Sequence, residues 1–320
     1  MSRRGFRVVV AGLSFVAWFG TATAWAEEPP ESPPPAFVAP PPGYEPPTSQ
    51  GPTYVPTEPP PASTGEIPPT LLTLDRMDAH SRLGLQIGFD KLDDFSLSDL
   101  FVMRFDPYAQ YVFPGKGGGI YAQLPIAHAF VEGDDSTGYG NLEMGGFFLP
   151  MHSNDLILRV GLAAATASDD DGAVANAIAV YERLTDLALA IPNYTTVRVS
   201  ASTVQQVDQW FFRADGGFDL AIDHPSGTDD PSVFFRANVA AGIRLPGVDL
   251  AVELANLAFV NGTVDGGITG RFNHTAAISA RTTGENQLHI GTVFPLDSPN
   301  GTGPRGELWI LSLGYQRAFY

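Results

Sequence analysis

The stretch that decides the fold is Gly306 to Tyr320, GELWILSLGYQRAFY. Its large apolar side chains fall on alternate residues, at Trp309, Leu311, Leu313, Tyr315 and Phe319, and the residues that separate them are mostly small or polar. A period of two is the spacing of a β-strand, whose side chains point alternately to two faces. The stretch therefore predicts a strand with one apolar face and one small or polar face.

The same alternation recurs upstream between residues 82 and 294. In Arg82–Asp90 the apolar residues share one parity, and Phe101–Phe113 repeats the pattern against charged and amide residues. We count twelve candidate strands of about 9–15 residues, close to the ~9–11 that a tilted membrane-crossing strand needs. Their lengths predict an all-β protein, an antiparallel transmembrane β-barrel of about twelve strands over residues 80–320.

The connections between these strands alternate in length. Residues 114–118, 150–155, 246–247 and 282–286 are short, whereas 132–138, 168–193, 223–231 and 296–306 are longer or acidic. Transmembrane barrels have short periplasmic turns and longer external loops. Within the loop 168–193, Ala173 to Ala190 carries apolar residues three or four apart, which predicts one short helix in an external loop.

Two resemblances support the same class. A C-terminal strand that ends in an aromatic residue resembles the closing strand of a Gram-negative outer-membrane β-barrel, although here the alternation runs through Phe319 and leaves Tyr320 one residue out of phase. Tyr139 to Thr166 resembles a strand pair in outer-membrane transport barrels of the aromatic-degradation-operon type. These resemblances imply a porin-like protein of the outer membrane, surrounded by lipid.

The first 79 residues have a different composition. Residues 1–26 combine early arginines, an apolar core and Ala24-Trp25-Ala26, the pattern of a cleaved secretory signal peptide. Residues 27–70 hold 17 of the 28 prolines, which are incompatible with helix or central strand. We therefore expect residues 27–79 to be a disordered periplasmic linker, with peptidoglycan or a periplasmic protein as its candidate partners.

Charge and cysteine content exclude several classes of function. The formal net charge is −17, which disfavours nucleic acid as a partner. The chain has no cysteine, so it forms no disulfide, thiolate metal site or cysteine nucleophile. The histidines lack metal-ligand spacing, and no loop has the pattern of a phosphate or cofactor cradle. We predict no cofactor and no metal site, and the oligomeric state stays open.

The face opposite the apolar one carries charges of both signs, and in a membrane barrel this face lines the lumen. One interpretation is a polar conduit with charge-based selectivity. The other is a network of ion pairs that fills a narrow lumen and stabilises it. The predicted lumen-facing residues are Arg104, Asp106, Glu143, Arg159, Arg198, Arg213, Asp215, Arg236, Arg244, Glu253, Arg271 and Arg281.

Three functions fit these features to different degrees. The prediction is a pore or transporter for small solutes, or a structural envelope protein. The alternative is a secreted soluble β-sandwich that binds carbohydrate or protein, which would have to bury its apolar faces against a second sheet. A membrane hydrolase built on His152 to Asp155 is disfavoured, because adjacent residues in a short turn seldom form a nucleophile and base pair. We therefore predict no catalytic residues and no enzyme activity.

Overall fold

The computed structural model describes residues 71–76, 78–92, 101–115, 117–130, 135–152, 155–169, 172, 175, 179–223, 233–260, 272–296 and 308–319. The predicted signal peptide, residues 27–70 of the predicted linker and most of the acidic loops lie outside these ranges. No helix among the described residues is long and apolar enough to cross a bilayer.

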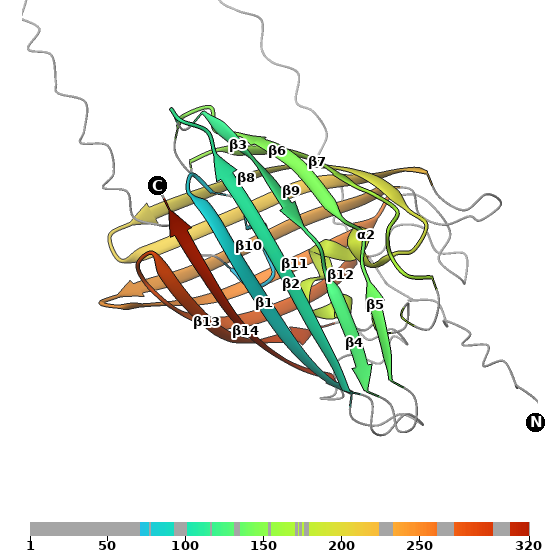
Figure 1. Ribbon diagram of the computed structural model, residues 1–320. Helices are drawn as coiled ribbons and strands as arrows, with labels where there is room; N and C mark the ends of the chain where they lie inside the picture. Colours follow the sequence, from blue (N-terminus) through green and yellow to red (C-terminus); the bar gives the residue numbers. More distant parts are fainter. Residues whose placement is uncertain are drawn as a thin grey trace, which may run out of the picture. The chain divides into compact units, whose positions relative to one another are not determined.

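The described strands form one antiparallel sheet that closes on itself (Figure 1). Closure is made by β1, which pairs with β14 on one side and with β2 on the other. The strands are β1 (Ser81–Leu92), β2 (Phe101–Val112), β3 (Gly118–Gln123), β4 (Ile126–Phe130), β5 (Ser136–Tyr139), β6 (Glu143–Phe148), β7 (Ile157–Ala163), β8 (Thr195–Val207), β9 (Trp210–Asp223), β10 (Val233–Leu245), β11 (Val248–Phe259), β12 (Phe272–Thr282), β13 (Asn286–Pro295) and β14 (Leu308–Phe319).

These fourteen segments make up twelve strands of the barrel wall, because two of the wall strands are each divided into two segments. β3 and β4 both pair with β2 and together form one wall strand, which is interrupted at Leu124-Pro125, where proline has no N–H to donate. β5 pairs with β4 and β6 pairs with β3, so β5 and β6 together form the next wall strand. The prediction of a twelve-stranded antiparallel barrel is confirmed. The soluble sandwich is contradicted, because a closed single sheet has no second sheet against which to pack.

Alternation along each strand divides the barrel into an apolar outside and a polar inside. In β7, Leu158, Val160 and Leu162 are exposed, whereas Ile157 and Arg159 are buried. In β14 the outward positions include Leu311, Tyr315 and Phe319, and the inward Ser312 and Gln316 are fully buried. An exterior of large apolar side chains around a charged interior is the arrangement of a barrel that faces lipid.

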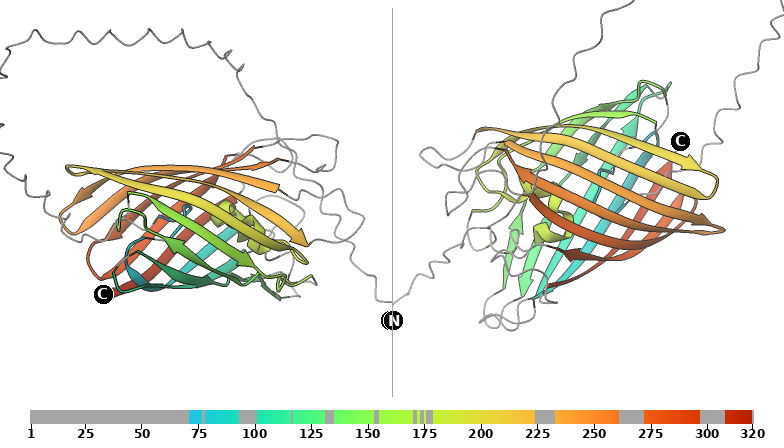
Figure 2. Two further views of the ribbon diagram at one scale, coloured as in Figure 1. Left: turned by 90° about the horizontal axis from the view of Figure 1, so that it is seen from above. Right: turned by 180° about the vertical axis from the view of Figure 1, so that it is seen from behind.

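The short connections gather at one end of the barrel, where the C-terminus also lies (Figures 1 and 2). They include the turn between β10 and β11, with Gly247 at φ +84°, and the turn between β12 and β13, with Gly284 at φ +105°. These positive φ values favour glycine, which has no Cβ to clash. By the rule that periplasmic turns are short, this is the periplasmic end.

Two segments lie inside the barrel, where the sequence predicted neither. Leu71 to Asp75 and His80 are buried, although the prediction extended the disordered linker to residue 79. This is a correction: the described part of the barrel domain begins at Leu71. The helical part of the loop before β8 comprises a 3₁₀ helix, η1 (Val180–Asp186), kinked at Arg183, and α2 (Leu187–Ala190). Its described residues Leu184, Ala188 and Leu189 are buried, so this loop folds inward instead of standing outside.

Leucine side chains help to seat the N-terminal segment, Leu71–His80, against the inner wall. Leu71 and Leu74 pack with Phe211, Ala240 and Ala251 of β9 to β11. Leu72 packs with Ala277, Val293 and Ile310 of β12 to β14. Leu71, Leu72 and Leu74 are each at most 1% exposed. Fully burying such a side chain contributes about 1.5–3 kcal/mol, so these contacts hold the segment in place.

Val160 offers a test of the lipid-facing exterior, because it is 59% exposed at the centre of β7. We expect Val160→Arg to lower the free energy of unfolding in bilayers by about 2–4 kcal/mol, since charge on the lipid face is costly near the midplane. Val160→Leu is the matched control and should change little. Reversible urea unfolding in liposomes measures both. An arginine tolerated within ~0.5 kcal/mol would indicate a water-facing surface.

Candidate functional site: the occluded lumen

The structure places the predicted lumen residues on the inner face. Arg244 is partly exposed and donates from Nε to Asp249 at 3.1 Å. Arg271 lies outside the described residues. The other ten are buried: Arg104, Asp106, Glu143, Arg159, Arg198, Arg213, Asp215, Arg236, Glu253 and Arg281.

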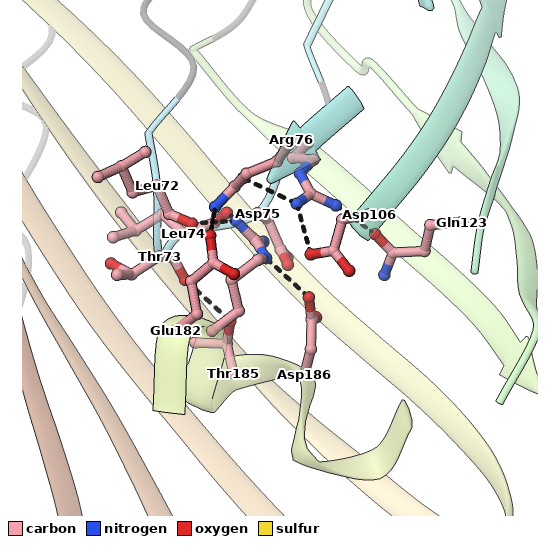
Figure 3. Close-up of polar contacts among 12 residues, drawn as sticks. Leu72, Thr73, Leu74, Asp75, Arg76, Asp106, Gln123, Glu182, Thr185 and Asp186 are labelled. Atoms are coloured by element: carbon pink, nitrogen blue, oxygen red, sulfur yellow. Dashed lines mark hydrogen bonds and ion pairs between the residues drawn. The ribbon is translucent and has the colours of Figure 1, made fainter. Parts of the chain in front are cut away.

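Asp75 of the N-terminal segment lies at the centre of this charged face (Figure 3). Its Oδ1 accepts from Arg159 Nη1 at 2.6 Å and lies 3.4 Å from Arg236 Nη1. Its Oδ2 accepts from Ser200 Oγ at 2.8 Å. Burial opposes ionisation, but Arg159, Arg236 and the other nearby donors together outweigh it and hold the pKa of Asp75 well below its usual range. Asp75 is therefore a carboxylate that bridges the segment to β7, β8 and β10.

The main chain of the segment is held by wall carboxylates. Glu253 of β11 accepts from the backbone N–H groups of Leu72 at 2.9 Å and Thr73 at 2.8 Å, and from Thr73 Oγ1 at 2.8 Å. The N–H of Asp75 donates to Asp215 Oδ2 at 2.8 Å. An irregular segment has no strand partners, so these carboxylates satisfy donors that would otherwise be buried unpaired.

Arg76 reaches the opposite wall. Its guanidinium donates to Asp106 Oδ2 at 3.0 Å, to Gln86 Oε1 at 2.9 Å and to Gln123 Oε1 at 3.1 Å. It also lies over the ring of Tyr108, 4.6 Å from the centroid, in cation–π geometry. Asp75 contacts β10 and the adjacent Arg76 contacts β2, which lie on opposite sides of the closed sheet, so the segment spans the lumen.

The helical loop before β8 also binds the N-terminal segment, through the main-chain carbonyl groups of the segment (Figure 3). Arg183 donates to the carbonyl oxygens of Leu72 and Leu74, the latter at 2.8 Å, and Thr185 Oγ1 donates to the carbonyl of Thr73 at 2.8 Å. Asp186 accepts from Arg183 Nε at 2.7 Å and lies 3.3 Å from Arg198 Nη1. The loop thus satisfies the carbonyls of the segment, as the wall satisfies its N–H groups.

Ion pairs connect the wall strands to one another around these two segments. Glu143 receives both Arg159 and Arg198. Asp219 receives Arg198 at 3.2 Å and Arg236 at 2.9 Å. A cavity between the helical loop and β4, lined by Arg104 and Asp186 among others, measures about 10 Å³. That volume holds about one water at most, so the helical loop packs closely against β4 at this point.

Two buried carboxyl groups have oxygen atoms that accept no hydrogen bond. Neither oxygen of Asp90 on β1 has a hydrogen-bond partner, and neither has Glu182 Oε2. Glu182 Oε1 accepts from Gln86 Nε2 at 2.8 Å and Ser312 Oγ at 2.7 Å. Burial, with Asp106 adding to it and Arg104 opposing it, raises the pKa of Glu182. The contact between η1 and β1 therefore favours a protonated Glu182.

Sequence reasoning missed the groups that close the lumen. They are Thr73, Asp75, Arg76 and Asp78 on the N-terminal segment, and Glu182, Arg183 and Asp186 on the helical loop. One signal was present, since the proline-rich stretch ends at Pro69 and residues 71–82 carry four Asp and Arg residues. His152 of the rejected hydrolase motif is exposed in its turn, and Ser153 and Asn154 lie outside the described residues.

Known structures share this architecture. The COG4313 outer membrane channel from Pseudomonas putida F1 superposes with a TM-score of 0.52 at 18% identity, covering 79% of this chain and all of that one. The fold is that of an outer-membrane β-barrel. The NanC porin and the translocator domain of the autotransporter NalP from Neisseria meningitidis also align, at 10% identity each, over 74% and 75% of this barrel protein and 99% and 88% of their own chains, with TM-scores of 0.42 and 0.41. No family model and no curated protein matches the chain.

Glu182 and Asp186, four residues apart, should respond oppositely to charge removal. Asp186 has a pKa well below its usual range because Arg183, Arg198 and Arg104 outweigh its burial. Asp186→Asn should therefore cost about 3–5 kcal/mol of unfolding free energy, since it leaves the buried Arg183 without its carboxylate partner. Glu182→Gln should leave stability at neutral pH unchanged or raise it.

The pH dependence supplies the control for this pair. A raised carboxyl pKa means that the folded state binds the extra proton, so Glu182 adds stability as pH falls from neutral toward 4.5. A lowered pKa works the other way, so the Asp186 contribution is lost only below about pH 4. Urea unfolding of the wild type and both variants from about pH 7 to about pH 3 measures the two effects. Equal losses in both variants would contradict the assignment.

Proposed function

We propose that this chain is a gated channel of the outer membrane for small polar solutes, closed in the state described here by its own N-terminal segment. The observation that carries the proposal is the position of Leu71–His80, which spans the lumen from Glu253 on β11 and Arg236 on β10 to Asp106 on β2. The apolar exterior and the barrel fold support the location.

The contacts that hold the segment favour reversible displacement. They are mainly charged and polar pairs, whose net contribution is small because both partners are well solvated when they separate into a water-filled lumen. Only the leucine contacts resist displacement by apolar burial.

The wall left behind is polar and of mixed sign. Arg159, Arg198 and Arg236 lie on one side, and Glu253 and Asp106 lie on others. Such a lining suits small hydrophilic solutes. Residues 27–70 join the segment at Leu71, so we further propose that peptidoglycan or a periplasmic protein bound to them acts on the gate through the chain itself.

Single-channel recording in planar bilayers tests the gate. We expect the wild-type chain to show low conductance with rare openings, and Asp75→Ala to open more often, because it frees Arg159 and Arg236 from the segment. Asp155→Ala, an exposed acid in the turn before β7, is the matched control. A difference in gel mobility between unheated and boiled samples in detergent would check that each variant is a folded barrel.

A cross-link gives the converse test. The chain has no cysteine, so Thr73→Cys with Glu253→Cys provides one defined pair. A short bis-maleimide that joins them should abolish openings, whereas the same two cysteines capped separately should not. Absence of current from every folded variant would contradict the channel and favour a structural envelope role.

A further inference from the structure

The outer wall of the barrel is hollowed over β9 to β14 and β1. One hollow, of about 600 Å³, is lined by apolar residues including Leu85, Leu288, Leu313 and Tyr315. A second, of about 620 Å³, is lined by Trp210, Leu250 and Leu311 among others. The two adjoin, because Ala280 and Ile290 line both. The wall therefore carries two neighbouring apolar furrows on its lipid-facing surface.

The furrows lie between large outward side chains such as Leu288, which is 60% exposed, and Ile290, which is 50% exposed. Ala280 is a small outward residue in both furrows, and the lumen-facing Gly291 and Gly314 present only backbone to the outside. The furrows are thus shallow channels between ridges, with a ridge at Ile290 between them. This shape fits two flexible chains side by side better than it fits the flat face of another barrel.

A single cation stands at the periplasmic edge of the first furrow. Arg317 is exposed and occupies an outward position that the alternation of β14 otherwise gives to apolar residues. It lies two residues beyond Tyr315, and in register it pairs with Leu83 of β1 and Asn286 of β13. The next row toward the membrane centre is Leu85, Tyr315 and Leu288, which line the furrow.

Arg317 lies two residues before the end of β14, and the ends of membrane-crossing strands lie at the membrane interface. Long cationic side chains near the ends of membrane segments extend toward the interface, and a guanidinium binds phosphate by charge-assisted hydrogen bonds. Lipid tails are as apolar as leucine, so the furrows offer shape but little driving force of their own. Arg317 supplies the preference for one lipid in one orientation.

We propose that the two furrows and Arg317 form a binding site for one phospholipid of the periplasmic leaflet. Its acyl chains lie on either side of Ile290, and its phosphate pairs with Arg317. The site rests on the outer-membrane location proposed above, and it does not depend on the gate. Lipopolysaccharide shares the chemistry of phosphate and acyl chains, but the short turns place Arg317 at the opposite end of the barrel from the outer leaflet.

Native mass spectrometry of the full chain in mild detergent tests the site, with dipalmitoyl phosphatidylglycerol as the probe. We expect one lipid to stay bound to the wild type. Arg317→Gln should weaken binding about tenfold, which corresponds to ~1.4 kcal/mol. Arg317→Lys should restore most of it, and Ile290→Trp should reduce it by filling the space on both sides of the ridge. Val160→Trp, on β7 and outside both furrows, is the control for an added outward aromatic side chain.

Three outcomes would overturn the proposal: no retained phospholipid, equal retention by all five proteins, or selective retention of lipopolysaccharide when both lipids are offered. Recordings on the same preparations separate this result from the channel. Adding Arg317→Gln to the Asp75→Ala variant should leave its channel openings unchanged. Loss of bound lipid with unchanged current would therefore show that the substitution affects the lipid site and not the channel.

Discussion

A charged side chain that is turned into a narrow barrel must find a counter-charge or water, and the interior of this protein is organised by that requirement. Side chains alternate between the two faces of each strand, so a strand that places its apolar residues toward lipid must place its polar residues toward the lumen. Arg159, Arg198 and Arg236 thereby converge on one region of the wall. Glu143 and Asp219 pair with them in part, and Asp75 and Asp186 complete the pairing from segments that are not strands.

The wall also makes room for these segments. On the inner face of β1, a Cβ placed on Gly88 would lie 1.9 Å from Glu182 Oε2, and one on Gly84 would lie 2.3 Å from the ring of Tyr108. No side chain fits at such distances. Glycine at these two positions lets η1 and Tyr108 lie directly on the backbone of β1. The sequence of β1 therefore provides the space that the groups inside the lumen occupy.

The wall could be predicted from the sequence, whereas the contents of the lumen could not. A period-two pattern such as that of β14 can be recognised within a single strand, without knowledge of its neighbours. The number of strands and the inward placement of residues such as Arg104 and Glu253 therefore follow from the sequence. Asp75 and Arg183 carry no such pattern. Their positions depend on partners 84 and 109 to 111 residues away in the chain, and only the closed barrel brings those groups together. The proline-rich composition of residues 27–70 also made it easy to extend the predicted linker past Pro69, where charged residues replace proline.

Hydrogen exchange of the intact protein measures the central claim without altering the chain. The N–H groups of Leu72, Thr73 and Asp75 donate to buried carboxylates of the wall. Exchange of the folded barrel in detergent or nanodiscs, followed by peptide mass spectrometry, should show peptides over residues 71–80 protected far beyond the rate of an unstructured chain. Exchange of these amides at the unprotected rate, while the strands stay protected, would contradict the account and leave the lumen open.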